Sequence, residues 1–218
     1  MREDICSIPI TEVFEKKDGC PICRIYDMLE TRMVDYIMGD AMMEPDIRIE
    51  TNKKGFCRRH YDKMGDCRAK LAFSLVLNTH INRLMALKQS QLEKELSYLQ
   101  QSCFVCEKIE WGVSHLLDTL FHLYEKETEF RALFKQQPYI CLKHYDMLLK
   151  SDSKKKLKKH KKEFNSDLYA AASRRGKQLS GLLKEFSSTF DYHSKPNTEL
   201  PNEIKHSIFD AVDYLSGR

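Results

Sequence analysis

The sequence predicts an all-α protein of two pseudo-repeated helical lobes, each with a metal site and a long helix. Three observations support this prediction. One cysteine and histidine motif occurs twice, and apolar residues between the motifs recur at helical spacing. No segment long enough to form a strand alternates between apolar and polar residues. The chain has 218 residues, 42% hydrophobic and 31% charged, which is enough to bury a core.

The repeated motif is C-x2-C followed, after an interval of nearly the same length in both copies, by C-x2-H. Cys103 and Cys106 correspond to Cys20 and Cys23 at a constant offset. His60-Tyr61-Asp62 is matched by His144-Tyr145-Asp146 at an offset only one position longer. We therefore predict a first zinc-binding repeat over residues 1–101, a second over 102–192, and a linker with a C-terminal helix over 193–218.

The chemistry of the motif predicts two zinc ions per chain. Two thiolates separated by two residues can face one ion, and three thiolates with one imidazole complete a tetrahedral set that suits Zn2+. The predicted ligands are Cys20, Cys23, Cys57, His60, Cys103, Cys106, Cys141 and His144. We expect each C-x2-C to share an ion with the C-x2-H that follows it, although the nearly equal spacings equally allow a crossed arrangement.

The first repeat begins with a lead-in that ends in a turn at Asp18-Gly19. Apolar residues over 24–43 predict an amphipathic helix, which Glu44-Pro45-Asp46 ends, and a turn over 52–55 precedes Cys57. From Arg68 to about Gln100 there is neither proline nor glycine. A drifting apolar stripe predicts one long helix there.

The second repeat follows the same plan. A helix after Cys106, a short helical turn over 130–134 and a break at Gln137-Pro138 precede Cys141. Another long helix is predicted over about 154–188. The segment from His193 contains two prolines and is predicted to be a linker to a short helix over 202–216.

Four protein ligands leave no open position on the ion, so the sites are predicted to be structural. No nucleophile, base and orienting group form a recognisable set, and no catalytic or cofactor-binding residue is assigned. The expected function is a non-catalytic interaction or regulatory module with a protein partner. The alternative is an iron–sulfur or thiol redox protein that uses the C-x2-C pairs. Covalent haem attachment is disfavoured because neither pair is followed directly by histidine.

A lysine run over 154–162 gives a third alternative, nucleic-acid binding. It is weakly supported, because the formal net charge is only +4 and no aromatic residue interrupts the lysines. No secretory or membrane-spanning segment is recognisable, so we expect a reducing cytoplasm and no membrane partner. There, paired cysteines more often bind metal than form disulfides. Cys6 and Cys67 lie outside the motif and are predicted to be buried apolar residues.

Four segments of the chain carry a resemblance to a known family: Ile8 to Phe14, the Cys-Pro-Ile-Cys knuckle at 20–23, Pro45 to Cys57, and Phe190-Asp191-Tyr192. The chain is similar over nearly its whole length to a bacterial family of uncharacterised proteins, a domain of unknown function with two CxxC…CxxH patterns. That resemblance implies the two metal sites and brings no established activity. The chain departs from it after Tyr192, where it lacks a tryptophan-containing stretch associated with relatives.

Overall fold

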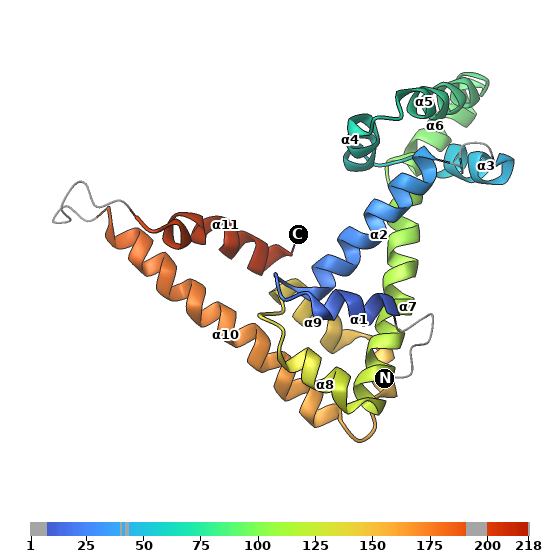
Figure 1. The fold of residues 1–218 in the computed structure, drawn as a ribbon. Coiled ribbons are helices and arrows are strands. Elements are labelled where there is room, and N and C mark those ends of the chain that lie inside the picture. The colour runs from blue at the N-terminus through green and yellow to red at the C-terminus, as the bar shows by residue number, and fades with distance from the viewer. Residues whose placement is uncertain (1–7, 40, 42–43, 191–199, 218) are drawn as a thin grey trace. The chain divides into compact units, whose positions relative to one another are not determined.

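A computed structural model of the chain describes residues 8–39, 41, 44–190 and 200–217. These residues form helices and no strand, which confirms the predicted all-α class (Figure 1). None of the helices so described is long and apolar enough to cross a bilayer. The α-helices are α1 (Ile8–Glu15), α2 (Pro21–Met38), α3 (Pro45–Lys54), α4 (Arg58–Asp66), α5 (Lys70–Met85), α6 (Gln89–Leu99), α7 (Phe104–Lys126), α8 (Thr128–Lys135), α9 (Leu142–Lys150), α10 (Lys161–Ser188) and α11 (Asn202–Ser216), and a 3-10 helix, η2, spans Asp152–Lys156.

The chain divides into two compact units that do not coincide with the two sequence repeats. Unit 1 comprises Met1–Ile25 and His115–Arg218, and unit 2 comprises Tyr26–Ser114. Each repeat therefore contributes residues to both units. Helices α2 and α7 each begin in one unit and end in the other.

The core of unit 1 is aromatic. Phe14 of α1 lies 5.1 Å from Phe130 of α8, measured between ring centroids, and Tyr124 of α7 lies 4.9 Å from Phe164 of α10. All four rings are fully buried, and Phe134 joins the two pairs. Aromatic side chains each bury a large apolar area, so this cluster joins α1, α7, α8 and α10.

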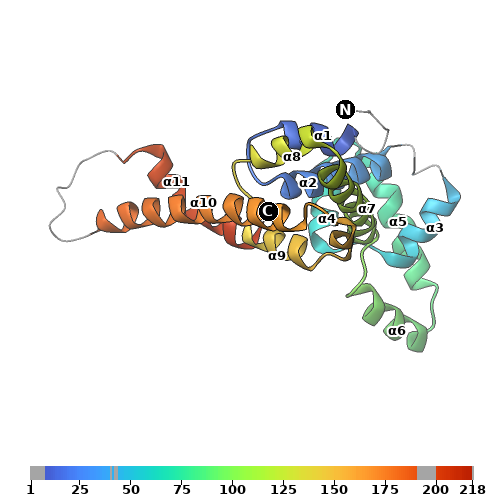
Figure 2. The ribbon, with the colours of Figure 1, turned by 90° about the horizontal axis from the view of Figure 1, so that it is seen from below.

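Helix α11 packs back along α10 within unit 1 (Figure 2). The Tyr214 hydroxyl donates a 2.8 Å hydrogen bond to the carbonyl of Ala172, and Gly176 leaves room for that ring. Helix α11 begins and ends at the residues predicted for it. The predicted linker before it lies mainly outside the described residues.

In unit 2, two helices replace one long predicted helix. In place of a single helix over 68–100, α5 ends at Met85 and α6 begins at Gln89. The break lets Arg83 pair with Glu95 at 2.6 Å, whereas in a continuous helix twelve residues would separate them by about 18 Å. Gln91 accepts a hydrogen bond from the Lys88 amide and so helps to start α6. Neither glycine nor proline marks this turn, and for that reason it could not be read from the local sequence.

Other boundaries also differ from the prediction, and the helix predicted over 24–43 is α2, Pro21–Met38. Residues 45–54, predicted as a helix break and turn, form helix α3, since Pro45 occupies its first turn where a missing amide hydrogen does no harm. Gly55 ends it with φ of 59°, in the left-handed region that glycine adopts readily. The long helix predicted from residue 154 begins at Lys161, because η2 and a short loop take up the preceding residues.

Candidate metal centres

All eight predicted residues come together in two groups of four. Centre 1 consists of Cys20, Cys23, Cys141 and His144, all in unit 1, and centre 2 consists of Cys57, His60, Cys103 and Cys106, all in unit 2. Each centre thus takes its C-x2-C from one repeat and its C-x2-H from the other. The expected pairing within each repeat is wrong, and the crossed arrangement is the one observed.

Every motif lies at the start of a helix. Cys20 and Cys103 stand just before α2 and α7, while Cys57 and Cys141 are the N-cap residues of α4 and α9 with extended backbone, ψ of 162° and 157°. The second residue of each pair lies three positions later, on the same face of the first turn. The positive end of each helix dipole also favours thiolates there. The sequence spacing therefore suffices to aim two donor atoms at one point.

The donor atoms converge at distances that fit a tetrahedral zinc ion. Zn–S bonds of about 2.3 Å and Zn–N bonds of about 2.0 Å imply donor separations of about 3.8 Å between sulfurs and about 3.5 Å between sulfur and nitrogen. In centre 1, the Nδ1 atom of His144 lies 3.1 to 3.6 Å from the three sulfurs, and Cys23 Sγ lies 3.9 Å from Cys141 Sγ.

Centre 2 repeats this geometry. The Nδ1 atom of His60 lies 3.2 Å from Cys57 Sγ, 3.2 Å from Cys103 Sγ and 3.5 Å from Cys106 Sγ. The sulfurs of Cys57 and Cys106 are 3.9 Å apart. In both centres, all donor atoms lie within 4.8 Å of one another, so one small cation could touch all four.

The two centres differ in exposure. All four residues of centre 1 are buried, whereas in centre 2 Cys57 is half-buried and Cys106 is exposed. Burial raises the pKa of Cys20, and it raises that of Cys106 together with the neighbouring thiols. A hydrogen bond with Cys20 lowers the pKa of Cys141, but Cys23 and burial outweigh it and raise that pKa to about 11. Without a cation these thiols are protonated at neutral pH, so metal binding must displace their protons.

A buried carboxylate supports His60. Glu30 of α2 is 2% exposed, and its Oε1 atom lies 2.9 Å from His60 Nε2. Because a carboxylate accepts the Nε2 proton, Nδ1 keeps its lone pair toward the sulfurs. Burial opposes the charge of Glu30, but a hydrogen bond from Lys63 and the charge of Arg59 leave its pKa below the ordinary value. Burial lowers the pKa of His60.

Sequence reasoning missed Glu30, although a signal was present. Glu30 lies on the same stripe of α2 as the buried residues Ile22, Val34 and Ile37. A carboxylate on such a stripe needs a buried partner. The corresponding position of the second repeat is the buried apolar Val113, so the duplication does not extend to this support.

Centre 1 is supported by backbone contacts. The guanidinium of Arg24 donates hydrogen bonds to the carbonyls of Val13, Lys16 and Gly19, at 3.1, 2.7 and 2.9 Å. These bonds hold the loop that leads into Cys20. At the other end of the chain, Gly217 closes over the centre, since a Cβ atom there would lie 3.6 Å from Cys141 Sγ and 3.5 Å from the His144 ring.

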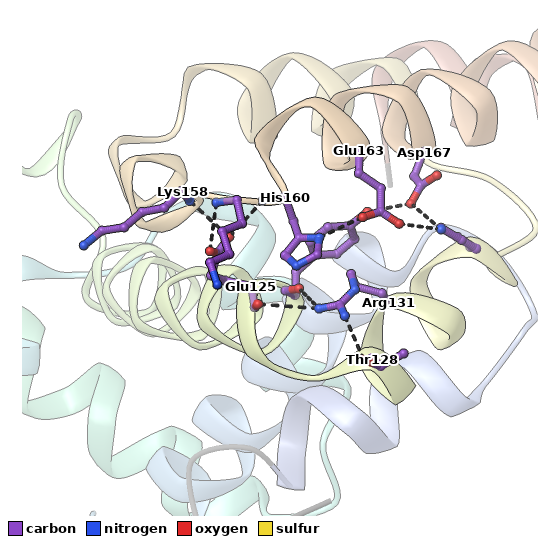
Figure 3. A network of polar contacts seen from close by, with 10 residues as sticks. Glu125, Thr128, Arg131, Lys158, His160, Glu163 and Asp167 are labelled. Carbon is purple, nitrogen blue, oxygen red and sulfur yellow. Dashed lines mark hydrogen bonds and ion pairs between the residues drawn. The ribbon is translucent and has the colours of Figure 1, made fainter.

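The predicted lysine run is partly occupied by local contacts (Figure 3). The carboxylate of Glu125 accepts the backbone amides of Lys158, Lys159 and His160 at 3.0, 2.9 and 3.3 Å. Lys156 lies 3.2 Å from Asp118. These contacts fix the backbone of the run, and the lysine ammonium groups at 158, 159, 161 and 162 have no ion pair among those found in the described part of the chain.

The same network continues into α10 (Figure 3). His160 Nδ1 lies 2.8 Å from Glu163, whose other oxygen lies 2.7 Å from Lys135. Hydrogen bonds from Lys135 and His160 lower the pKa of Glu163 to about 2.

Two cysteines lie outside the motif, and the sequence predicts both to be buried. Cys67 is instead half-buried, and its thiol donates a hydrogen bond to the carbonyl of Lys63. Cys6 lies outside the described residues.

A comparison with protein families decides the relationship. The sequence matches a family of unknown function (DUF6062) over residues 1–98 and, in a second overlapping alignment, over 84–218. The chain belongs to this family. No curated protein and no solved structure matches it significantly. The resemblance noted in the sequence is thus confirmed. Because the function of the family is unknown, the chemistry of the two centres is inferred from their own residues.

Proposed function

We propose that this chain is a cytoplasmic zinc protein whose two centres are structural and whose helices serve as a non-catalytic interaction or regulatory module. The observation that carries the proposal is the convergence of three sulfurs and one Nδ1 atom in each centre. Four such donors fill a tetrahedral shell, and a filled shell leaves no position for a substrate. Structural zinc contributes about 10–16 kcal/mol of apparent binding free energy, comparable to the stability of a whole domain.

Zinc is favoured over an iron–sulfur cluster by the donor set and by the size of the site. Clusters of that kind are usually held by four cysteines, and here each set includes a histidine. The donor separations of 3.1 to 3.9 Å also suit a single ion. The redox alternative makes a different prediction, since an iron–sulfur protein absorbs visible light and a zinc protein does not.

An interaction role is supported by apolar side chains that remain exposed on two helices. Helix α11 exposes Phe209, Val212 and Leu215, at 70%, 56% and 60%, and α5 exposes Leu71 and Met85, at 76% and 66%. Exposed apolar side chains along one helix are typical of surfaces that bind another protein. In this proposal the repeats 1–101 and 102–192 both bind zinc, and each repeat supplies two ligands to each ion. A protein partner binds the exposed apolar side chains of α5 and α11.

The test is the metal content of protein purified without oxygen or chelator, with an absorbance spectrum of the same sample. We expect two zinc ions per chain and no visible absorbance. Removal of the metal by a chelator should abolish helical circular dichroism, and zinc should restore it. The variant Cys67→Ser is the control, because Cys67 belongs to neither centre and its loss should leave two zinc ions. Iron with sulfide, or no metal at all, would refute the proposal.

A further inference from the structure

The two centres hold the same donor set but meet solvent differently. In each centre the C-x2-H cysteine has a sulfur 3.9 Å from the second cysteine of the C-x2-C motif: Cys141 and Cys23 in centre 1, Cys57 and Cys106 in centre 2. The centre 1 pair is buried, whereas Cys106 is exposed and Cys57 is half-buried. Because the distances match, exposure separates the two pairs, and centre 1 is an internal control for centre 2.

Cationic side chains lie around both centres, so exposure is the property that distinguishes them. A zinc ion with three thiolates carries one net negative charge, and the C-x2-H motif of centre 2 contains Arg58 and Arg59. Arg59 is 62% exposed, and it lies with Lys63 at the carboxylate that supports His60. Arg24 likewise interacts with the charge of Cys20 and Cys23 in centre 1, so charge alone does not separate the centres. In centre 1, all four donor residues are buried.

We propose that centre 2 is a peroxide-sensitive modification site, in which Cys106 and Cys57 form a disulfide and release the zinc ion while centre 1 keeps its own. This inference rests on the proposed zinc occupancy. The oxidant is hydrogen peroxide or another small hydroperoxide. Sulfur bound to zinc is a thiolate, and an accessible thiolate with a resolving cysteine nearby is the kind that such reagents oxidise.

The reaction proceeds in two steps. The Cys106 thiolate attacks one peroxide oxygen, the O–O bond breaks, and hydroxide leaves as a sulfenic acid forms. The Cys57 thiolate then attacks that sulfur, the S–O bond breaks, and a second hydroxide leaves. Two protons from solvent convert both hydroxides to water, so two sulfurs lose two electrons and the peroxide gains them. The ion retains only Cys103 and His60 in place of four ligands and dissociates.

Formation of the disulfide requires a modest movement. The sulfurs must approach from 3.9 Å to about 2.05 Å. Cys57 precedes α4 as its N-cap and Cys106 lies in the first turn of α7, so each side chain is at a helix end. Helix ends fray more readily than helix interiors. Oxidation of Cys106 takes its sulfur off the ion, and this removes the constraint that keeps the two sulfurs apart.

The experiment uses the full chain with Cys6→Ser and Cys67→Ser, so that all six remaining cysteines belong to the centres. Zinc is measured before peroxide treatment and then followed with a chromophoric chelator during treatment. Alkylation and peptide mass spectrometry identify the disulfide. We expect two zinc ions at the start, release of one, a Cys57–Cys106 disulfide, and recovery after a dithiol reductant and zinc are added. The Cys23 and Cys141 thiols should stay reduced throughout.

Several results would overturn the inference and leave the proposed function intact. They are two zinc ions at the start with none released, both ions released at one rate, oxidation of the Cys23 and Cys141 pair at the rate of centre 2, or a disulfide that joins Cys106 to Cys103. A protein without zinc before treatment would instead refute the proposed function, and this inference with it. The starting zinc content therefore distinguishes the two failures.

Discussion

Replacement of Glu30 by glutamine tests whether the buried carboxylate sets the metal affinity of centre 2. The carboxylate lies 2.9 Å from His60 Nε2 and accepts hydrogen bonds from Arg59 and Lys63. An amide can still accept one hydrogen bond from the imidazole, but a neutral acceptor bonds about half as strongly as a charged one. We expect Glu30→Gln to weaken zinc binding at centre 2 by about tenfold, the low end of the effect of such supporting residues.

The larger change Glu30→Leu removes the acceptor altogether. It leaves the Nε2 proton of His60, which is 2% exposed, without its partner. The expected loss rises toward 100-fold, or about 2.8 kcal/mol. Arg59 and Lys63 are 62% and 44% exposed and can turn to water, so the loss of their ion pairs adds little.

The assay is competition with a chromophoric chelator, which reports both centres of one chain in the same titration. Centre 1 is the internal reference, and Glu110→Gln is the control, since Glu110 is exposed and bonds only to Tyr26 among the contacts found in the described residues. Equal weakening of both centres by Glu30→Gln would indicate general destabilisation. Unchanged affinity of centre 2 in Glu30→Leu would refute the role assigned to the carboxylate.

Three further predictions concern packing, acid stability and the crossed ligands. A Cβ atom at Gly176 would lie 2.9 Å from the Tyr214 hydroxyl, so Gly176→Ala should lower the free energy of unfolding by about 1–3 kcal/mol and deprotect α11 in hydrogen exchange. A Cβ atom at Gly181 would meet nothing within 4 Å, so the control Gly181→Ala should stabilise the protein. Equal effects of the two variants would contradict this. The pKa of Glu163 is lowered to about 2, so its contribution is present above about pH 4.3 and is lost as pH falls toward 2. Glu163→Gln should therefore lower the urea midpoint at pH 7, and a deficit that does not shrink toward pH 3 would count against the ion pairs. Cys57→Ser should leave one zinc ion, and it should expose amides of residues 104–114 to hydrogen exchange as well as those of α4, because centre 2 joins these segments. An effect confined to residues 1–101 would indicate pairing within the repeat.

The eight clustered cysteine and histidine residues could be picked out of the sequence because their evidence is local. Two donors three positions apart at a helix start face the same way whatever surrounds them, and the structure brings the eight residues together as two groups of four. Helix α11 was also bounded correctly, since Pro201 and Gly217 flank its apolar stripe. Local patterns of this kind carry their own geometry.

Features that depend on distant contacts were not predictable in the same way. The nearly equal gaps between the C-x2-C and C-x2-H motifs fit either pairing, and only tertiary packing decides between them. The break after Met85 contains no glycine or proline and is stabilised by Arg83 and Glu95 across the turn. Glu30 gains its role from His60, 30 positions away, so no local rule assigns it.

The exchange of ligands nests one closed loop inside another. Centre 2 joins residues up to 49 positions apart, from Cys57 to Cys106, and this whole interval lies within the 118 positions between Cys23 and Cys141 of centre 1. Once centre 2 has closed, the loop that centre 1 must close is effectively shorter by the length of that inner interval. Since closure entropy scales as (3/2)RT ln n, the saving is about 0.5 kcal/mol. During synthesis the inner loop is complete when Cys106 emerges, well before His144, so the order of translation and the order of lowest entropy cost coincide.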